Sequence, residues 1–293
     1  MRYFGKCLSA GIVAFLGFAG PAPAGDDTVI RFGVVPLEDK MTMYKQFSPL
    51  AKYLGKELGC EVKIVVGQDY QAAMDALAKN DTQFAYLTPT VYPKCERQNP
   101  DAGVRPLVRF LEGGKGTYKS CIIVPASSTI NDIAELKGKK FGFGSKDSTA
   151  SHLMPRSALL AKGIDPEKDF AELKYLGSHT NVAEAVALGN VDAGGVKDSV
   201  AEKFQKEGKV KIIFTSSEIP EFPVCTNSKV DKALADKMVA ALAKLNQPSE
   251  ESKTVVTSIN AKYTGTEPAK AEDYDVIRGM IKTIYGDTFY NRQ

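Results

Sequence analysis

The sequence predicts an α/β protein of two lobes, each a mixed sheet flanked by helices, joined by a two-strand hinge. Strand and helix patterns alternate along most of the chain, which is typical of sheets covered by helices. The length of 293 residues suits two domains of ordinary size. The chain is expected to enter a second group of elements near residue 118 and to leave it near residue 224, and two crossings indicate a hinge.

The first lobe is predicted from strand and helix patterns that alternate as in a parallel sheet. Asp69 is expected to cap the second helix, and glycines at 113–116 end this part of the chain. The expected strands are 29–35, 62–66 and 83–87, and the expected helices are 41–58, 70–78 and one through Cys95.

The second lobe and the return to the first follow the same kind of pattern. Expected strands are 118–124, 140–143, 191–196, 211–214 and, after two prolines, 224–227. Expected helices are 133–138, 148–162, 180–188, 230–245 and 271–285. The domain division is therefore 25–117 for lobe one, 118–224 for lobe two, and 225–293 for the return to lobe one with C-terminal helices.

The N-terminus has the three-part plan of a secretory signal over residues 1–24. Arg2 and Lys6 precede an apolar run at 8–18, and small residues lead to a cleavage site near Ala24. The run is shorter than the roughly 20 residues that span a bilayer. Cys7 lies ahead of the run, where it is not placed for lipid modification. We expect a diffusible periplasmic protein.

The charge balance is close to neutral. The formal net charge is +3, and removal of Arg2 and Lys6 with the signal leaves +1. Without a basic cluster there is no electrostatic reason to expect nucleic acid or an anionic membrane surface as a partner.

Four cysteines remain after the signal, in a compartment that permits disulfides. If the two crossing strands run side by side, Cys121 and Cys225 come within disulfide reach. A Cys60–Cys95 bond is a weaker expectation, and four buried thiols are the alternative. Cysteine spacing matches no zinc site, and His152 and His179 are the only histidines, so no metal or cofactor is expected.

The segment 145–152, Ser-Lys-Asp-Ser-Thr-Ala-Ser-His, follows a strand and opens a helix. Unpaired N–H groups and a partial positive charge make such a helix start suited to anions. Ser148, Thr149 and Ser151 add hydroxyl donors, and Ala150 permits close backbone approach. An ordinary helix cap with extra polar residues is the alternative.

Other candidates stand at strand or helix ends, where ligands of open α/β sheets bind. His179 precedes a helix, and Asp198 follows the strand 191–196. Tyr70, Thr88 and Tyr118 also flank strand ends. Taken singly, each of them fits packing or capping as well as ligand contact.

Catalytic motifs are absent from the sequence. There is no Gly-x-Ser-x-Gly elbow and no Walker loop, and residues 113–116 lack the spacing of either phosphate-binding glycine motif. Nothing joins His152 or His179 to a nucleophile and an orienting group. The sequence therefore favours a binding protein over an enzyme.

Together, five segments between residues 30 and 245 resemble the phosphonate, phosphite and phosphate-binding proteins of ABC importers. They are Gly67-Gln68-Asp69-Tyr70, Leu87-Thr88-Pro89-Thr90, Gly116-Thr117-Tyr118-Lys119-Ser120, Asp147-Ser148-Thr149-Ala150-Ser151, and Ser178-His179-Thr180-Asn181 with Asp198 downstream. The resemblance implies the two-lobed periplasmic binding protein fold, a small phosphorus oxyanion as ligand, an ABC permease as partner, and a monomer. It also implies a ligand site of Tyr70, Thr88, Tyr118, Ser148, Thr149, Ala150, Ser151, His179 and Asp198.

One departure narrows the expected ligand. Aminoalkylphosphonate binders of this family carry an acid just before the returning strand's proline, where this chain has Phe222, and the acid is shifted to Glu221. This favours phosphite, phosphate or a simple alkylphosphonate. Asp198 is expected to accept a hydrogen bond from a protonated ligand oxygen and to repel a fully ionised one. A receptor for a membrane sensor and a periplasmic phosphoester hydrolase are the alternative functions.

Overall fold

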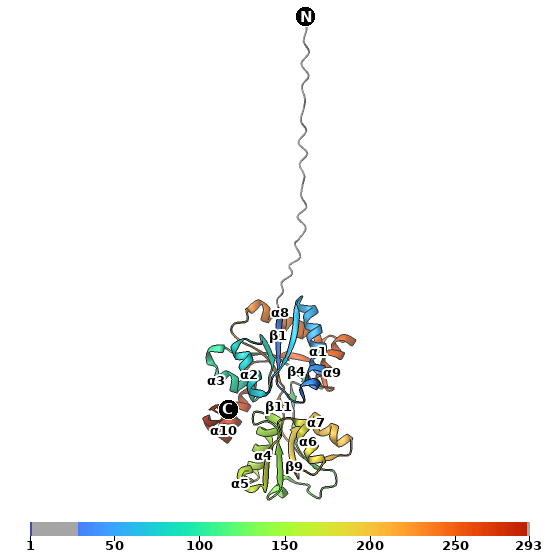
Figure 1. The fold of residues 1–293 in the computed structure, drawn as a ribbon, viewed down its shortest axis with the longest axis vertical. Coiled ribbons are helices and arrows are strands. Elements are labelled where there is room, and N and C mark those ends of the chain that lie inside the picture. Colours follow the sequence, from blue (N-terminus) through green and yellow to red (C-terminus); the bar gives the residue numbers. More distant parts are fainter. Residues whose placement is uncertain (2–28, 292–293) are drawn as a thin grey trace.

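The computed structural model describes Met1 and residues 29–291, which form two lobes, one above the other in Figure 1. The expected signal segment, with Cys7, falls almost entirely outside this range. Within it, the helices are too short or too polar to cross a bilayer.

Lobe one is built on a six-stranded sheet in the order β13-β4-β12-β3-β1-β2. The strand β1 pairs in parallel with β2 and β3, as the alternating pattern predicts, whereas β12 pairs antiparallel with β3 and β4. The strands are β1 Val29–Val34, β2 Glu61–Val66, β3 Phe84–Tyr86, β4 Arg105–Glu112, β12 Pro223–Thr226 and β13 Tyr263–Pro268.

Six α-helices accompany this sheet, together with short 3₁₀ turns. Asp69 caps α2 by accepting from the Ala72 amide, which confirms the predicted cap. The helices are α1 Lys40–Leu58, α2 Tyr70–Lys79, α3 Val91–Gln98, α8 Lys232–Ala243, α9 Glu250–Ile259 and α10 Asp275–Tyr285. The 3₁₀ turns are Pro100–Ala102, Lys244–Asn246, Ala271–Tyr274 and Gly286–Asn291.

Lobe two is built on a five-stranded sheet in the order β10-β6-β9-β7-β8. Its strands are β6 Ser120–Pro125, β7 Lys140–Phe143, β8 Glu172–Tyr175, β9 Ala193–Lys197 and β10 Val210–Thr215. Its helices are the 3₁₀ turn η2 Ile133–Leu136, the π-helical turn η3 Thr149–Leu153, α4 Met154–Ala161, α5 Pro166–Asp169, α6 His179–Ala187 and α7 Asp198–Lys206.

The two lobes are joined by a pair of short strands, which confirms a two-strand hinge, but the return crossing lies at residues 219–220 instead of near 224, because β12 already belongs to the sheet of lobe one. The strand β5, Thr117–Tyr118, pairs antiparallel with β11, Ile219–Pro220. The strand β11 is labelled at the waist of the molecule in Figure 1.

The core of lobe two lies on both sides of its sheet. Alternate residues of β6 face opposite sides, so that Ile123 joins one buried cluster and Ile122 the other.

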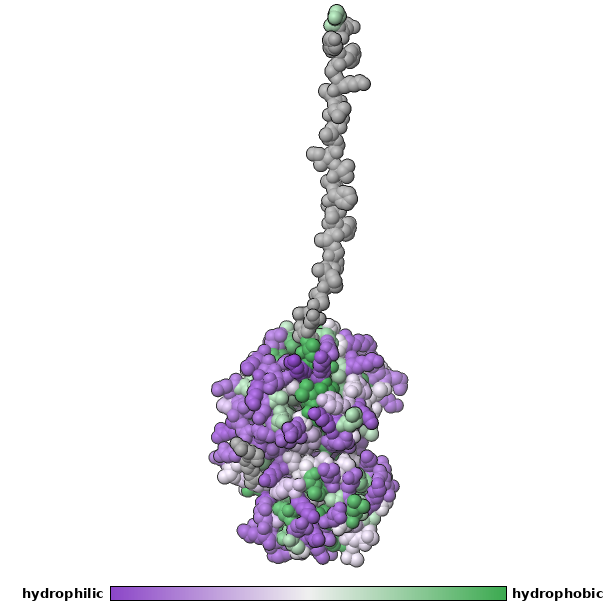
Figure 2. Space-filling view, in the orientation of Figure 1, coloured by the Kyte–Doolittle hydropathy of each residue, from purple (hydrophilic) through white to green (hydrophobic). Residues whose placement is uncertain are grey.

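Apolar packing shows that the lobes are closed on one another. The large core of lobe one also includes Ala150 and Leu153, which belong to lobe two. The side of the molecule that Figure 2 shows is hydrophilic over much of both lobes.

The structure differs from the sequence prediction at several elements. The helix expected over 148–162 begins with a π-helical turn, a form frequent at functional sites. The strands β4 and β13 were not predicted. In β13, Gly265 and Pro268 lower the strand propensity that would have marked it.

The predicted Cys121–Cys225 and Cys60–Cys95 disulfides are wrong, because all four cysteines are free. Cys121 lies in β6 of lobe two, and Cys225 lies in β12 of lobe one. The strands that run side by side at the crossing are β5 and β11, and both cysteines lie beyond them in different sheets. The alternative of buried thiols fits Cys95, Cys121 and Cys225, whereas Cys60 is half-buried.

Candidate ligand site between the lobes

Helix starts from both lobes converge between the two sheets. They are the starts of α2 at Tyr70, α3 at Val91, η3 at Thr149 and α6 at His179. The hydroxyls of Thr90 and Thr149 lie 2.7 Å apart across the lobe boundary, and Ser148 Oγ lies 3.2 Å from His179 Nε2. Because each helix start carries partial positive charge, their convergence favours an anion.

Glycines allow η3 to pack closely against the lobe-two sheet. A Cβ atom at Gly144 would lie 2.6 Å from Ser151 Oγ, and one at Gly195 would lie 2.5 Å from Pro155 Cγ. Ser151 Oγ donates to the Gly195 carbonyl and accepts from the Gly144 amide, while its own amide donates to Ser148 Oγ. Ser151 therefore fixes the turn, and its hydroxyl is already engaged.

His179 is a neutral ring with a defined tautomer. Burial, followed by the nearby charge of Lys197, lowers the pKa of His179 to about 3. The Lys197 amide donates to Nδ1 at 2.9 Å, so the ring proton resides on Nε2 and points to Ser148. Ser148 Oγ then accepts from Nε2–H and from the Ser151 amide, which leaves the Ser148 hydroxyl proton free to be donated.

Two tyrosine hydroxyls face this helix start without hydrogen-bond partners among the described residues. The buried hydroxyl of Tyr70 lies near Ser148, and that of Tyr118 lies near Thr149. Burial raises the pKa of both tyrosines, so both remain O–H donors. An unpartnered buried hydroxyl costs about 1–3 kcal/mol, which a ligand oxygen could recover.

Polar contacts hold the lobes together around this point. Lys94 of α3 contacts both carboxylate oxygens of Asp147, at 2.8 and 2.9 Å, and its side chain is 1% exposed. Thr88 Oγ1 lies 3.4 Å from the Asp147 carbonyl. At the edge, the hydroxyl of Tyr285, at the end of α10, lies 2.8 Å from His152 Nε2. Lys94 is a candidate site residue that the sequence does not single out, and Thr90 and Asp147 stand in the quoted segments without being predicted as ligand contacts.

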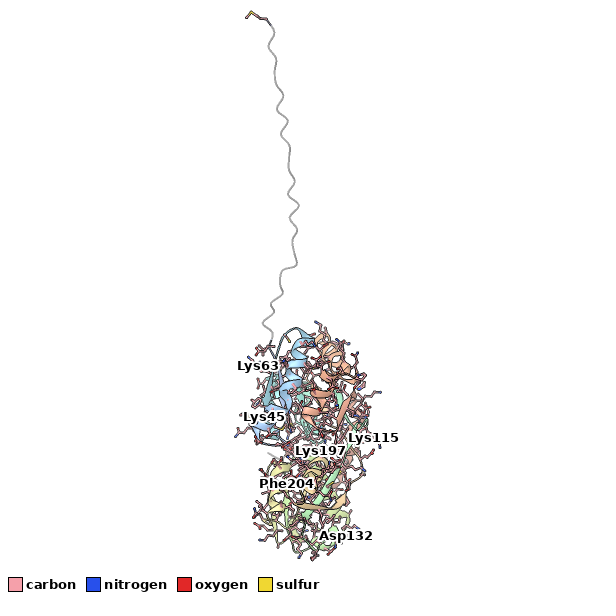
Figure 3. The ribbon with its side chains drawn as sticks, turned by 90° about the vertical axis from the view of Figure 1, so that its right-hand side faces the viewer. Lys45, Lys63, Lys115, Asp132, Lys197 and Phe204 are labelled. Carbon is pink, nitrogen blue, oxygen red and sulfur yellow. The ribbon has the colours of Figure 1, made fainter. Side chains whose placement is uncertain are left out.

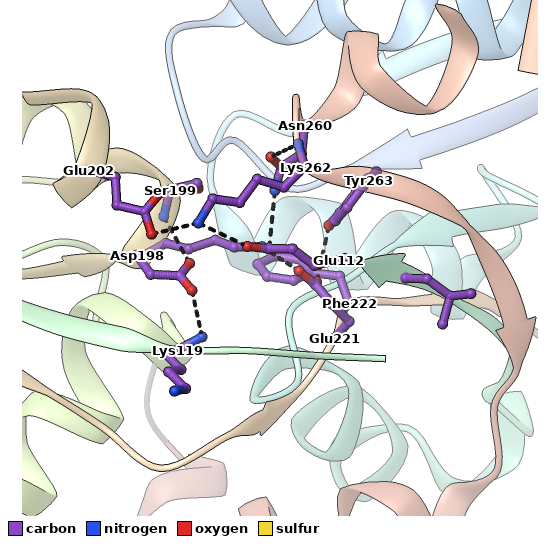
Figure 4. A network of polar contacts seen from close by, with 12 residues as sticks. Glu112, Lys119, Asp198, Ser199, Glu202, Glu221, Phe222, Asn260, Lys262 and Tyr263 are labelled. Atoms are coloured by element: carbon purple, nitrogen blue, oxygen red, sulfur yellow. Dashed lines mark hydrogen bonds and ion pairs between the residues drawn. The ribbon is translucent and has the colours of Figure 1, made fainter. Parts of the chain in front are cut away.

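Asp198, the first residue of α7, lies at the hinge and not among the four helix starts that converge between the sheets. Its carboxylate accepts from the amides of Lys119 and Ser199, at 3.1 and 2.8 Å (Figure 4). Burial raises the pKa of Asp198, and Glu112 adds to that rise while Lys197 opposes it. The structure thus brings eight of the nine predicted site residues together. The contact expected between Asp198 and a ligand stays a prediction.

Lys197 and Glu221 form a buried ion pair beside the helix starts. Figure 3 shows Lys197 at the waist between the two lobes. Burial alone would lower the pKa of Lys197, but the carboxylates of Glu221, Glu112 and Asp198 raise it, so the ammonium is charged. A cavity of about 640 Å³ between the lobes is lined by Lys197, His179 and Phe222, among others. A lysine at the carboxyl end of a buried strand was the signal that could have identified Lys197.

The residues at this site offer neutral donors rather than metal ligands. Within residues 29–291, His, Cys, Asp and Glu form no group suited to a metal ion. What the site offers is the Ser148 hydroxyl, which the His179 Nε2–H supports, together with two tyrosine hydroxyls and the first amides of η3. This set can surround a small anion with hydrogen bonds.

Comparison with known proteins identifies the family. The pattern of the family described as "ABC transporter, phosphonate, periplasmic substrate-binding protein" matches residues 32–274. The phosphate-import protein PhnD of Mycolicibacterium smegmatis is 25% identical over 275 residues, covering 87% of this chain and 85% of that protein. The phosphonates-binding periplasmic protein of Escherichia coli is 26% identical over 267 residues, covering 83% of this chain and 77% of that protein.

A solved structure has the same two-lobed fold. PhnD1 from Prochlorococcus marinus, in complex with methylphosphonate, matches with a TM-score of 0.80 at 20% identity, over 88% of this chain and 98% of that one. Because the family pattern extends from β1 to the start of α10, this chain belongs to the periplasmic phosphonate-binding proteins of ABC transporters.

Proposed function

We propose that this chain delivers a small phosphorus oxyanion, namely phosphite, phosphate or a simple alkylphosphonate, to an ABC permease. The observation that carries the proposal is the pair of buried hydroxyls on Tyr70 and Tyr118, which have no partner among the described residues and face a helix start. A tetrahedral anion placed among them would accept hydrogen bonds from lobe one, the hinge and lobe two. The names of the relatives, which include phosphate, phosphonates and methylphosphonate, support a phosphorus ligand.

The donors of the site favour a singly charged ligand. His179 is neutral, and the Lys197 ammonium is paired with Glu221. The attraction therefore comes from dipoles and hydroxyls instead of an unpaired cation, and a second negative charge on the ligand would face the buried Glu221 carboxylate. Asp198 would add to this selection as the acceptor of a protonated ligand oxygen.

Asp198→Asn tests that part of the proposal. If Asp198 selects protonated ligands, binding of phosphite and phosphate to the native protein should weaken as pH rises from 6 to 8 and each ligand loses its second proton, and the variant should lose this pH dependence. Ligand ranking and pH profile equal to those of the native protein would exclude this role for Asp198.

Closure of the lobes is the proposed mechanism of capture. The Lys94–Asp147 pair, the Thr90–Thr149 contact and the hydrogen bond between Tyr285 and His152 all join the two lobes. A ligand that adds hydrogen bonds to both lobes shifts the population toward the closed form, which a permease or a membrane sensor would recognise.

A hydrolase function is disfavoured by the tautomer of His179. A histidine that activates serine needs an unprotonated Nε2, with Nδ1–H held by an acceptor. Here Nδ1 accepts from the Lys197 amide, so Nε2 carries the proton and cannot take one from Ser148. The Ser148–His179 pair is therefore arranged to donate to an anion and not to generate a nucleophile.

Calorimetric titration of the native protein tests the proposal. We expect one ligand per chain for phosphite, phosphate or methylphosphonate, weaker binding of sulfate, which is not protonated at neutral pH, and no release of phosphate from 4-nitrophenyl phosphate. The absence of a binding heat with all three phosphorus oxyanions, or turnover of the ester, would contradict it.

A further inference from the structure

The ammonium of Lys197 lies inside a cage of aromatic rings. Its Nζ atom is 4.3 Å from the ring centroid of Tyr118, 5.1 Å from that of Phe222 and 5.4 Å from that of Tyr263. Each distance falls within the roughly 6 Å at which a cation is attracted by an aromatic face. Three rings around one ammonium form the kind of site that binds an organic cation.

Two buried carboxylates complete the cage. Glu221 forms an ion pair with Lys197 Nζ, and Glu112 lies 3.4 Å from the same atom. The side chains of Glu221 and Glu112 are 0% and 8% exposed. The Tyr263 hydroxyl and the Phe222 amide donate to Glu221 Oε2, which fixes the carboxylate in place. Glu221 thus needs a cation, because a lone buried charge is strongly unfavourable.

This cage adjoins the proposed oxyanion site. The Tyr118 ring contacts the ammonium, while the Tyr118 hydroxyl lies near Thr149 at the helix start. The backbone amide of Lys197 holds His179 in its tautomer. Lys197, Phe222 and Tyr263 also line the 640 Å³ cavity that reaches His179. An amino group carried by a ligand at the oxyanion site would therefore have this cage as its neighbour.

We infer that Lys197 determines specificity: its ammonium occupies an aromatic and carboxylate cage beside the oxyanion site, as a tethered internal cation that keeps amine-bearing ligands out. The role in ligand selection rests on the proposed function, but the occupancy of the cage does not. Removal of Lys197 would leave Glu221 buried without its cation and would open the cage to a cation from solution or from a ligand.

A purely structural ion pair would behave differently. If Lys197 served only to neutralise Glu221 in a closed core, its removal would destabilise the protein in a way that no added cation could repair. Selective rescue by a cation of the right size is therefore the readout that separates a binding cage from a packed ion pair.

The first test is chemical rescue of the Lys197→Ala variant by an added cation, and the rescue is measured as a rise in Tm on thermal unfolding. We expect its Tm to fall by on the order of 10 °C, and about 50 mM propylammonium to restore about 3 °C or more. Neutral 1-propanol and sodium chloride should not do so. Lys203→Ala is the matched control, because Lys203 lines the same cavity but is exposed. Equal Tm values of Lys197→Ala in propylammonium and sodium chloride would overturn the inference.

A second variant covers the case in which the alanine variant does not fold. Lys197→Met keeps the side-chain stem and lacks only the ammonium, so the ammonium ion itself should restore its Tm while tetramethylammonium, which is too large, should not. Loss of this discrimination between the two ions would equally overturn the inference.

The ligand test uses calorimetry with methylphosphonate and 2-aminoethylphosphonate. The ratio of their affinities should move at least tenfold toward the aminophosphonate in Lys197→Ala and stay unchanged in Lys203→Ala. An unchanged ratio in Lys197→Ala would contradict the role in specificity. If propylammonium rescues the variant but the native protein binds no phosphorus oxyanion, the cage is supported and the proposed function is what fails.

Discussion

The oxyanion site and the Lys197 cage are neighbours that differ in whether their polar groups have partners within the chain. At the helix start, two buried tyrosine hydroxyls lack partners among the described residues, and Ser148 has a proton left to donate. In the cage, the Lys197 ammonium meets two carboxylates and three rings. Donors that have no partner in the chain can bind a ligand, whereas a site whose groups are already paired within the chain excludes one. Ligand specificity can therefore be set by a side chain that already occupies part of the binding region.

We expect the largest loss of ligand affinity when a negative charge is placed at the helix start. Ser148→Asp keeps the cap, because aspartate is a good N-cap residue, but sets a carboxylate against the ligand. Two like charges about 4 Å apart at an effective dielectric constant near 20 repel by about 4 kcal/mol, roughly a thousandfold in affinity. Calorimetry with methylphosphonate measures the loss.

Ser148→Asn is the matched control for this prediction. It keeps the cap without adding charge and should retain measurable binding. Equal losses in the two variants, with both folded by circular dichroism, would mean that charge at this position does not matter.

The next effect separates the two nitrogens of His179. His179→Gln can keep a donor near Nε2, whereas His179→Asn can keep only the acceptor for the Lys197 amide. We expect His179→Asn to lose about 2 kcal/mol of ligand binding, roughly 30-fold, because Ser148 Oγ loses the Nε2–H that orients its hydroxyl proton toward a charged ligand, and His179→Gln to lose less. Calorimetry would reveal the reverse order if the acceptor mattered more than the donor.

A smaller effect concerns the unpartnered hydroxyls. Tyr70→Phe removes a donor that only the ligand satisfies, so ligand affinity should fall about tenfold while the stability of the free protein is unchanged or slightly higher. Tyr86→Phe is the contrast, because its hydroxyl lies 2.6 Å from that of Tyr263, and its loss should lower stability. Thermal unfolding without ligand that ranks Tyr70→Phe below Tyr86→Phe would contradict this.

The smallest effect is the pH dependence contributed by His179. Its pKa is lowered from 6.5 to about 3 in the folded state, so the unfolded chain binds more protons between these values. The stability contributed by the neutral ring is complete above pH 6.5 and is lost as pH falls toward 3. Between pH 6 and pH 5 the free energy of unfolding should fall by about 1 kcal/mol more in the native protein than in His179→Gln. Denaturant titrations in which the free energy of unfolding changes equally with pH in both proteins would exclude this contribution of His179.

Sequence reasoning was most successful where local signals act alone. The alternation of strands and helices predicted both lobes, and the polar residues after β7 predicted the Ser148 helix start. Positions that depend on the meeting of distant segments were harder. The role of Lys197 depends on Glu221 and Tyr263, which are distant in the sequence. The strands β11, β12 and β13 bring these residues next to Lys197, and β13 itself was not predicted. The disulfides failed for the same reason, since a shift of a few residues along the crossing strands placed Cys121 and Cys225 in different sheets.

One measurement compares the open site and the filled cage in a single sample. Methylphosphonate and 2-aminoethylphosphonate compete for the native protein, and ³¹P NMR distinguishes the bound from the free form of each. We expect methylphosphonate to be bound and 2-aminoethylphosphonate to stay free at equal concentrations. Preferential binding of 2-aminoethylphosphonate, or no binding of either ligand, would contradict it.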